Sequence, residues 1–545
     1  MEEFREVFQE PKGLPPKRYC DYHIPLLPNS GPVFVRPYRH TPGQKDEIER
    51  QVQEMLHNGV IQHSTSAFSS PALLVKKKDG SWRVYIDYRQ LNSITQKGTY
   101  PMPVIDELLD ELAGAKFFSK LDLRAGYHQI RMAAGDEHKT AFQTHSGHYE
   151  YKVMSFGLTG APATFQSAIN DTLRSVLRKC ALVFFDDILI YSPDMPSHLC
   201  HLKQVLQLLV DHQWKVKLSK CAFAQEQISY LGHIISGSGV ATDPSKIQSI
   251  VDWARPTTIK KLRGFLGLAG YYRKFVKNFG TIIKPLTQLL KKDVPFQWTA
   301  EVDKAFVALK LALVSASVLA LPDFNQTSTI ETDASDFGIG AVLSQNQHPV
   351  AFISKALEPR TQGLSTYEKE CLAIMMAVDH WCPYLQFQEF QILTDHHSLM
   401  HLTEQRLNTP WQHKAFTKLM GLQFKIVYRK GKYNAAADAL SRNVPTELSE
   451  FLAISVCSPS WLQEVVKGYE QDPVSTKLLT ELAINPDAHT HYKLSQGLLK
   501  HKGRVWVGDN PSLQYQIISV LHDSPMGGHS GFPVTYKRIK ALFSW

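Results

Sequence analysis

Residues 181–192, ALVFFDDILIYS, decide the fold of the longest part of the chain. Apolar residues flank Asp186 and Asp187 on both sides, which predicts a strand, a tight turn and a second strand with two carboxylates at the tip. An Asp-rich turn without a chemical role is equally compatible with this stretch alone. Upstream, FFSKLDLRAGYHQI places Asp122 directly after another apolar strand.

These three carboxylates together form a candidate metal site. Carboxylates at the ends of adjacent strands make an oxygen cage that suits Mg²⁺. Two such ions ~3.5–4 Å apart can activate a 3′-hydroxyl and stabilise a leaving pyrophosphate. Acids this close repel one another unless cations neutralise them. Short strands and helices alternate over residues 100–240, which indicates an α+β domain around the site.

The composition indicates a globular protein of several domains. At roughly 150 residues per domain, 545 residues correspond to about three or four domains. A hydrophobic fraction of 43% excludes a wholly disordered chain. The apolar runs are far shorter than the ~18 residues of a membrane helix, and the polar N-terminus predicts no signal peptide. Seven scattered cysteines predict reduced thiols in an intracellular compartment.

Positive charge is concentrated in one segment. The whole chain carries a formal charge of only +9, but ten Lys or Arg residues stand against one acid between Arg255 and Asp293. Residues 244–292 also show helical periodicity, with an apolar stripe that includes Leu262 and Phe265. A polyanionic partner and a solvated helix face are both compatible with this pattern.

Several motifs in order resemble a reverse transcriptase of the gypsy-type LTR retrotransposon Pol polyproteins. They are FSKLDLRAGYHQI, FGLTGAPATFQ, FFDDILIYS and YLGHII, supported by SWRVYIDYRQLN and FLGLAGYYRKF. The FFDD variant and the opening EPKGLPPKR resemble plant copies. The resemblance covers essentially the whole chain. It implies a right-hand polymerase with an extended lead (1–43), fingers and palm (44–242) and a basic helical thumb (243–293).

The resemblance also implies roles for individual residues. Asp122 and Asp186 resemble the metal-binding catalytic acids, and Asp187 is the third carboxylate. Tyr127 resembles the aromatic gate that rejects a 2′-hydroxyl. Without the motifs, it would be interpreted as a residue that packs in the core. The implied nucleotide-binding residues are Lys77 or Lys78, Arg83, Tyr127, Phe156 and Gly157. The implied nucleic-acid-binding residues of the thumb are Lys260, Lys261, Arg263, Arg273, Lys274 and Lys277.

Two positions depart from the family pattern. The family usually has Pro where Ser155 stands and Asn where Gly160 stands. Neither change removes a metal ligand. Gly160 adds backbone freedom beside the pocket, which predicts weaker nucleotide positioning.

Residues 328–442 predict a second domain with its own acid cluster. The expected strands are 328–333, 338–344, 349–355, 390–395 and 424–429, with a helix over 366–381 and a short helix near 441. Four elements each contribute one acid: Asp333, Glu370, Asp395 and Asp438. Singly each acid is a common cap or turn residue, but in this order they resemble ribonuclease H. The nearby acids Asp336 and Glu368 fit that motif less well, and residues 294–327 are expected to be a short connector.

The C-terminal region carries the beginning of a third motif. Residues 443–510 are expected to form a linker and an integrase-leading region. In residues 511–545, His522 and His529 resemble the start of an integrase zinc domain. Zinc needs four ligands, and no cysteine follows Cys457, so the expected site is incomplete and zinc binding is expected to be poor.

The expected fold class is therefore α+β and α/β multidomain, with a right-hand polymerase, a ribonuclease H-like domain and a small incomplete zinc-binding-type segment. The resemblance implies an RNA-directed DNA polymerase with ribonuclease H activity that uses two Mg²⁺ per active site, with Mn²⁺ as an alternative. The implied partners are an RNA template, a primer, the RNA–DNA hybrid, deoxynucleoside triphosphates and the remainder of a Gag-Pol polyprotein, without a membrane.

Location follows only from the resemblance, which implies cytoplasmic virus-like particles and later nuclear delivery of the DNA. The chain is expected to be an internal piece of a larger polyprotein or a truncated gene model. A catalytically silent remnant, and a nuclease with the polymerase domain as a clamp, are alternative functions.

Overall fold

The computed structural model divides the chain into two compact units, residues 1–240 and 241–545. Among the described residues, no helix has both the length and the apolar character that crossing a membrane requires. The structure describes residues 2–11, 13–76, 80–98, 100–292, 294–386, 388–396, 399, 418–419, 421–429, 468–469, 472–484, 489, 491–495, 498–502, 504–522, 536, 539–540 and 543–545.

A four-stranded antiparallel sheet forms the centre of the first unit, in the order β7-β8-β4-β9. Two helices, α5 and α6, pack on this sheet, and their buried apolar side chains join those of the strands in one core. The α+β prediction for residues 100–240 is confirmed. The bounds are β4 (Phe117–Asp122), α5 (Ala161–Thr172), β7 (Ala181–Phe184), β8 (Asp187–Ser192), α6 (Met195–Asp211) and β9 (Ala222–Gln225).

The ALVFFDDILIYS segment forms the predicted hairpin. Phe184 and Asp187 are paired across β7 and β8, so only Phe185 and Asp186 make the turn. Phe185 has φ +51°, a left-handed conformation that a bulky residue adopts only at a cost. Its N–H donates to Oε1 of the buried Gln166 at 2.8 Å, and the amide nitrogen of Gln166 donates to a carbonyl of β7 at 3.2 Å. One buried side chain therefore links the end of β7 to the first residue of the strained turn.

A five-stranded sheet in the order β1-β6-β5-β2-β3 forms the second layer of this unit. The stretch SPALLVKKKDGSWRVYID contains β2 and β3, which pair antiparallel. Helix α2 begins at Pro42, and Oε1 of Gln44 accepts a hydrogen bond from the N–H of Thr41 at 3.0 Å. The bounds are α2 (Pro42–His57), β1 (Ile61–His63), β2 (Ser70–Lys76), β3 (Trp82–Ile86), β5 (Phe142–Gln143) and β6 (His148–Tyr151).

Shorter elements complete the first unit. The lead over 1–43 is extended except for two short helices at its start, whose Phe4 and Val7 are buried. A further sheet, β10-β11-β12, ends at the boundary between the units. The bounds are η1 (Glu2–Phe4), α1 (Arg5–Phe8), α3 (Arg89–Ser93), α4 (Ile105–Asp110), η2 (Gly126–Gln129), η3 (Glu137–Thr140), η4 (Leu218–Lys220), β10 (Gln227–Tyr230), β11 (His233–Ser236) and β12 (Gly239–Thr242).

The second unit begins with the predicted basic helices. Leu262, Phe265 and Ala269 of the expected apolar stripe are fully buried, and the Thr258 side chain caps the N-terminus of α8. A fifteen-residue helix, α11, lies within the stretch expected to be a connector and packs on α7, α9 and α10. The bounds are α7 (Pro244–Val251), α8 (Ile259–Tyr271), η5 (Arg273–Phe275), α9 (Phe279–Ile282), α10 (Lys284–Gln288) and α11 (Ala300–Val314).

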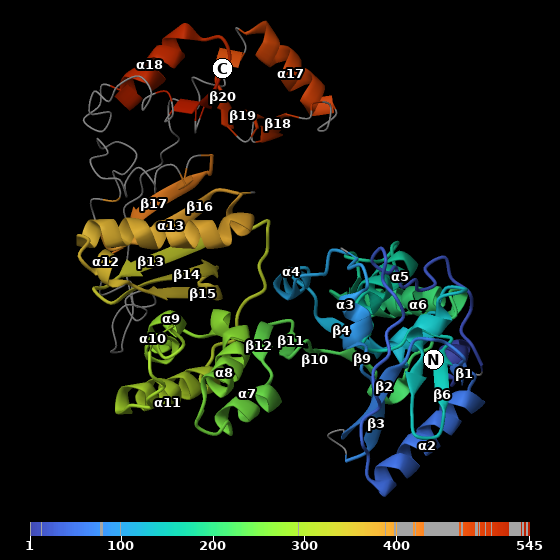
Figure 1. Ribbon diagram of the computed structural model, residues 1–545. Helices are drawn as coiled ribbons and strands as arrows, with labels where there is room; N and C mark the ends of the chain where they lie inside the picture. Colours follow the sequence, from blue (N-terminus) through green and yellow to red (C-terminus); the bar gives the residue numbers. More distant parts are fainter. Residues whose placement is uncertain are drawn as a thin grey trace. The chain divides into compact units, whose positions relative to one another are not determined.

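A five-stranded mixed sheet in the order β15-β14-β13-β16-β17 follows, and α13 lies across one face of it (Figure 1). The first three strands in sequence pair antiparallel, whereas β13, β16 and β17 run parallel. The predicted strands agree within one or two residues, while the helix extends four residues further than predicted. The bounds are β13 (Thr329–Ala334), β14 (Gly338–Gln345), β15 (His348–Ala356), α12 (Pro359–Gln362), α13 (Thr366–Leu385), β16 (Phe390–Thr394) and β17 (Phe424–Tyr428).

The C-terminal part has a small core of its own. Tyr469, Leu482, Leu499 and Val507 are buried together there. The strands pair in the order β18-β19-β20-β21. The bounds are α17 (Pro473–Ile484), β18 (Tyr492–Ser495), β19 (Leu498–His501), β20 (Arg504–Trp506), α18 (Pro511–His522) and β21 (Phe543–Ser544).

Candidate active sites

The three predicted palm acids lie together at one end of the central sheet. Asp122 ends β4 and is paired across the strands with Asp187, the first residue of β8. Asp186 stands beside them in the turn. The strand register thus brings Asp122 together with two carboxylates that lie more than sixty residues later in the sequence.

Two lysines that the sequence analysis missed neutralise part of this charge. Nζ of Lys220 lies 3.1 and 3.2 Å from the two carboxylate oxygens of Asp122. Nζ of Lys120 lies 3.1 Å from Oδ1 of Asp187. Lys120 precedes Asp122 by two residues on β4, so both side chains project from the same face of the sheet. That spacing was the signal available in the sequence, whereas Lys220 becomes visible only in the fold.

Asp186 is the carboxylate of this cluster for which no ion pair is found among the described residues. Its Oδ1 is buried and has no hydrogen-bond partner among the described residues. Burial raises the pKa of Asp186 to about 6, and repulsion from Asp122 and Asp187 adds to the effect. A buried oxygen without a partner, next to two further carboxylates, fits a divalent cation bound by oxygen ligands.

Gly126 is a second residue that the sequence analysis missed. A Cβ at this position would lie 2.0 Å from Oδ1 of Asp186 and 2.8 Å from the ring of Phe165. Only glycine therefore leaves room for the Asp186 carboxylate. The glycine stands between the Asp122 strand and Tyr127 in the sequence, but only the fold shows what it makes room for.

Three of the predicted nucleotide-binding side chains form one cluster. The guanidinium of Arg83 lies 4.4 Å from the ring centroid of Phe156, and the rings of Phe156 and Tyr127 are 4.7 Å apart. Burial and the nearby Asp186 raise the pKa of Tyr127 to about 12, so its hydroxyl stays protonated. His128 lies behind them, and burial together with Arg83 lowers its pKa to about 4. The predicted Lys77 and Lys78 lie outside the described residues.

Glycine is required at position 157 for its backbone. Gly157 has φ +92°, and its carbonyl accepts a hydrogen bond from the side chain of Asn92 at 2.8 Å. At position 160, the contact with a neighbouring side chain, rather than the backbone conformation, is what a larger residue would disturb. The N–H of Gly160 donates to the Tyr22 hydroxyl at 3.2 Å, and a Cβ would lie 2.9 Å from that oxygen. The expected gain of backbone freedom at Gly160 is therefore opposed by Tyr22, which occupies the space of a side chain.

The predicted thumb cations divide into two groups. Lys260, Lys261 and Arg263 are exposed on α8 and Arg273 is exposed on η5. Nζ of Lys274 lies 5.5 Å from the ring of the adjacent Phe275, whereas Nζ of Lys277 lies 5.5 Å from the ring of Phe352 in β15. The structure therefore places Lys277 against the mixed sheet.

The second predicted acid cluster lies at the end of β13. Ligand oxygens of Asp333, Glu370 and Asp395 all lie within 4.8 Å of one another. Oε1 of Glu370 accepts a hydrogen bond from the N–H of Ala334 at 2.9 Å, while its Oε2 is buried without a partner among the described residues. Burial, followed by repulsion from Asp333 and Asp395, raises the pKa of Glu370 to about 8. The fourth predicted acid, Asp438, lies outside the described residues.

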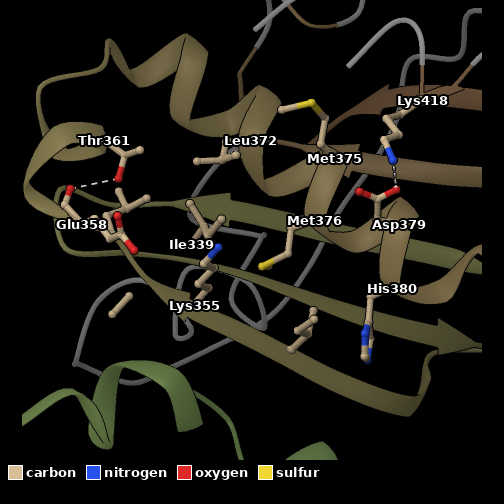
Figure 2. Close-up of a pocket in the computed structure, with 13 residues that line it drawn as sticks. Ile339, Lys355, Glu358, Thr361, Leu372, Met375, Met376, Asp379, His380 and Lys418 are labelled. Atoms are coloured by element: carbon tan, nitrogen blue, oxygen red, sulfur yellow. Dashed lines mark hydrogen bonds and ion pairs between the residues drawn. The ribbon is translucent and has the colours of Figure 1, made fainter. Parts of the chain in front are cut away.

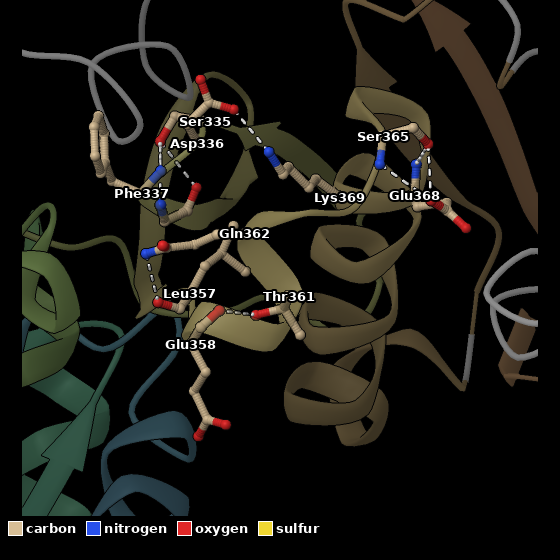
Figure 3. Close-up of polar contacts among 11 residues, drawn as sticks. Ser335, Asp336, Phe337, Leu357, Glu358, Thr361, Gln362, Ser365, Glu368 and Lys369 are labelled. Atoms are coloured by element: carbon tan, nitrogen blue, oxygen red, sulfur yellow. Dashed lines mark hydrogen bonds and ion pairs between the residues drawn. The ribbon is translucent and has the colours of Figure 1, made fainter.

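The two acids that fitted the motif less well have structural roles (Figure 3). Oε2 of Glu368 accepts hydrogen bonds from the N–H and hydroxyl of Ser365 at 3.1 and 2.9 Å, which caps α13. Oδ1 of Asp336 forms an ion pair of 2.7 Å with Lys369, whose side chain is only 6% exposed. Lys369 and Glu370 therefore attach the start of α13 to the end of β13.

A cavity of about 920 Å³ lies elsewhere on the same domain, between α13, β14 and β15 (Figure 2). Its lining is mainly apolar and includes Ile339, Leu372, Met375 and Met376, with an Asp379–Lys418 ion pair at its edge. None of the six predicted catalytic acids that the structure describes lines it. Of the predicted zinc ligands, His522 ends α18 and His529 lies outside the described residues.

Two protein-family profiles match the chain. The profile "Reverse transcriptase (RNA-dependent DNA polymerase)" matches residues 75–235, and "RNase H-like domain found in reverse transcriptase" matches residues 298–392. The first match contains the Asp122–Asp186–Asp187 cluster. The second contains Asp333 and Glu370 and begins near the start of α11.

Curated relatives come from retrotransposons. The retrovirus-related Pol polyprotein from transposon 297 of Drosophila melanogaster is 42% identical over 426 residues, which cover 77% of this chain and 40% of that protein. The transposon Tf2-3 polyprotein of Schizosaccharomyces pombe is 34% identical and covers the whole of this chain and 42% of that protein. The chain therefore spans about two fifths of the length of these curated relatives.

Solved structures of a foamy viral protease–reverse transcriptase share the fold. One, in complex with double-stranded DNA, has a TM-score of 0.70 at 22% identity and covers 79% of this chain and 77% of that one. Another, in complex with an RNA/DNA hybrid, has a TM-score of 0.65 at 22% identity and covers 83% of this chain and 61% of that one. At this identity the likeness concerns the fold.

Proposed function

The chain carries the reverse transcriptase domain and the ribonuclease H-like domain of an LTR retrotransposon Pol polyprotein, and we propose that it copies RNA into DNA and degrades the RNA strand of the hybrid. One observation carries the proposal. Each of the two domains holds a cluster of three carboxylates, and each cluster contains a buried oxygen without a partner among the described residues. Such clusters fit divalent cations, and Asp122, Asp186, Asp187, Asp333 and Glu370 fall within the two family matches.

In the polymerase domain, Asp122 and Asp186 would hold Mg²⁺, with Asp187 as the third carboxylate. The bound ions would supply a polarised 3′-hydroxyl and neutralise the charge on the triphosphate. Arg83 binds triphosphate oxygens, because its guanidinium is held over Phe156 and offers several donors in a fixed plane. Tyr127, packed between Phe156 and Phe165, presents a rigid ring against which the sugar of the nucleotide is selected.

In the nuclease domain, Asp333, Glu370 and Asp395 would hold the cations, with Asp438 as the fourth ligand. Glu370 is kept in place by the N–H of Ala334, and it must lose its proton when the cations bind. The RNA strand is the substrate because its 2′-hydroxyl distinguishes it from DNA. The exposed cations of α8 bind the phosphates of the duplex, so binding should weaken as salt rises.

Finer assignments extend this proposal. The motif set supports a gypsy-type element of plant-like character, with deoxynucleoside triphosphates, template and primer as ligands and a Gag-Pol polyprotein as the parent. Residues 511–545 would be the beginning of an integrase zinc segment that binds zinc poorly. Mn²⁺ would be an alternative to Mg²⁺ in both sites.

The test is an assay of both activities in one reaction. A DNA primer on a labelled RNA template is incubated with the chain, deoxynucleotides and Mg²⁺, with a chelator as control. Chelator-sensitive extension together with RNA shortening is the expected result. RNA shortening without extension would support the nuclease with a polymerase clamp. Neither activity, from a chain shown to be folded by circular dichroism, would overturn the proposal in favour of the silent remnant.

A further inference from the structure

The end of the basic helical segment packs against the mixed sheet of the nuclease domain. Both η5 and α9 contact β15, which is the outermost strand of that sheet among those described. An outermost strand exposes backbone groups that invite pairing with other chains, and a covering helix is one way to protect them. The contact therefore covers the open side of the nuclease sheet.

Two glycines make this contact closer than other residues would permit. A Cβ at Gly280 would lie 2.4 Å from the carbonyl oxygen of Ser354, and a Cβ at Gly338 would lie 2.9 Å from the hydroxyl of Thr281. By contrast, Gly270 in α8 has open space around it. Gly280 does not have a positive φ, so the close approach rather than the backbone conformation requires glycine there.

Polar contacts align the two surfaces. The N–H of Gly280 donates to the Ser354 hydroxyl at 2.9 Å, and Nζ of Lys284 donates to the Leu357 carbonyl at 3.4 Å. Lys277 lies over Phe352, as described above. Two lysines of the basic segment thus contact the nuclease domain. Lys284 is half-buried there, whereas Lys277 is exposed, as are Lys260, Lys261 and Arg263 on α8.

We propose that η5 and α9 dock the nuclease domain onto the basic helices, so that the two move as one body and address one stretch of hybrid. The inference rests on the proposed function for its substrate. Residues 294–327 link the two parts in sequence, and α11 within them packs on the basic helices α7, α9 and α10 rather than on the mixed sheet. The direct contact instead fixes the distance between the exposed cations of α8 and the cluster of Asp333, Glu370 and Asp395.

The contact itself can be tested by a cross-link. The double variant Thr281→Cys/Gly338→Cys places one cysteine on each surface. A Cβ at position 338 would lie 2.9 Å from the Thr281 hydroxyl, so the two cysteines are close enough to form a disulfide. Mild oxidation should join the two positions, as shown by mass spectrometry of unreduced peptides. The control pair Gly270→Cys/Gly338→Cys should not join. Equal yields for both pairs in the full folded chain would overturn the docking.

Its role can be tested by the position of RNA cuts relative to a recessed DNA 3′ end. The cross-linked protein should cut hybrid at the same positions as its reduced form. Gly280→Val, which forces the surfaces apart, should spread the cuts over several nucleotides, whereas Gly270→Val should leave them unchanged. Unchanged cuts with Gly280→Val, or loss of cleavage only on cross-linking, would overturn the inference. Absence of cleavage by the unmodified chain would instead refute the proposed function, while the cross-link would still report the contact.

Discussion

The two carboxylate clusters of this chain differ in what reduces the repulsion between their negative charges. In the palm, lysines supply positive charge, since Lys120 and Lys220 pair with Asp187 and Asp122. In the nuclease domain, a proton reduces the negative charge, because the pKa of Glu370 is raised to about 8. The neighbouring Lys369 forms its ion pair with Asp336 instead. Cation binding therefore competes with ammonium groups at the first cluster and with a proton at the second.

This difference has consequences for how each site responds to its surroundings. An ammonium competitor is covalently tethered to the chain and is removed only by substituting the lysine that carries it. A proton competitor depends directly on pH. The polymerase site should therefore respond mainly to lysine substitution, and the nuclease site mainly to pH.

The largest expected effect separates the two sites completely. Asp186→Asn should lower primer extension at least ~10³-fold while hybrid cleavage persists, and Glu370→Gln should do the reverse, because each removes a cation ligand from one cluster only. Extension and cleavage rates on the same substrate measure this. The exposed acids Asp211 and Glu358 provide controls as Asp211→Asn and Glu358→Gln. Extension that survives Asp186→Asn would refute the palm assignment.

Gly126→Ala should damage only the polymerase, by about 10²-fold, because the added methyl overlaps the position of the Asp186 carboxylate. Gly43→Ala is the control, since nothing lies within 4 Å of a Cβ there. Single-nucleotide incorporation measures the loss, with hybrid cleavage as the internal reference. Normal incorporation by Gly126→Ala would mean that Asp186 works in another position.

Lys120→Met should have a moderate effect that concerns cation binding. Without the ammonium beside Asp187, the Mg²⁺ concentration for half-maximal extension should fall several-fold, because the lysine no longer competes with the ion. This change corresponds to roughly 1 kcal/mol, the strength of a partly exposed ion pair. Lys120→Arg should restore the original requirement. Lys116→Met, an exposed lysine just before β4, is the matched control. An unchanged Mg²⁺ requirement would show that Lys120 does not compete with the ion.

The smallest expected effect is the number of protons released when Mg²⁺ binds at pH 7. A carboxyl with a pKa of about 8 is roughly 90% protonated there and one with a pKa of about 6 roughly 10%, so Glu370 should account for most of the release. Titration calorimetry in buffers of different ionisation enthalpy measures it. Glu370→Gln should remove most of the release and Asp186→Asn little. An equal loss in both variants would contradict the contrast between the clusters.

The same pKa shift predicts the pH dependence of stability without metal. At pH 5 to 8 the folded chain retains a proton on Glu370 that the unfolded chain loses, so stability should fall as pH rises through this range. Thermal unfolding in chelator at pH 5 and pH 8 should show the decline, and Glu370→Gln should reduce it. A steeper decline in that variant would contradict the assignment.

Local patterns predicted the elements that carry the acids. The apolar runs around Asp186 specified a hairpin, because alternation and a two-residue turn are properties of a short stretch. The strands of the second domain followed for the same reason. Lys220 and Gly126 were missed because their roles arise from distant residues, namely Asp122 and Asp186. The assignment of Lys277 to nucleic acid followed from the resemblance to a polymerase thumb, and its position over the Phe352 ring of a distant strand became visible only in the fold.

The contact between Tyr22 and Gly160 constrains how this chain can be recombined with its relatives. A segment around position 160 taken from a relative with Asn there would place a side chain where the Tyr22 hydroxyl lies, 2.9 Å from the Cβ position. The N–H of residue 160 would also lose an acceptor if Tyr22 were replaced alone. Residues 22 and 160 lie 138 positions apart in the sequence but are in contact. A functional chimera therefore has to take both residues from the same parent protein.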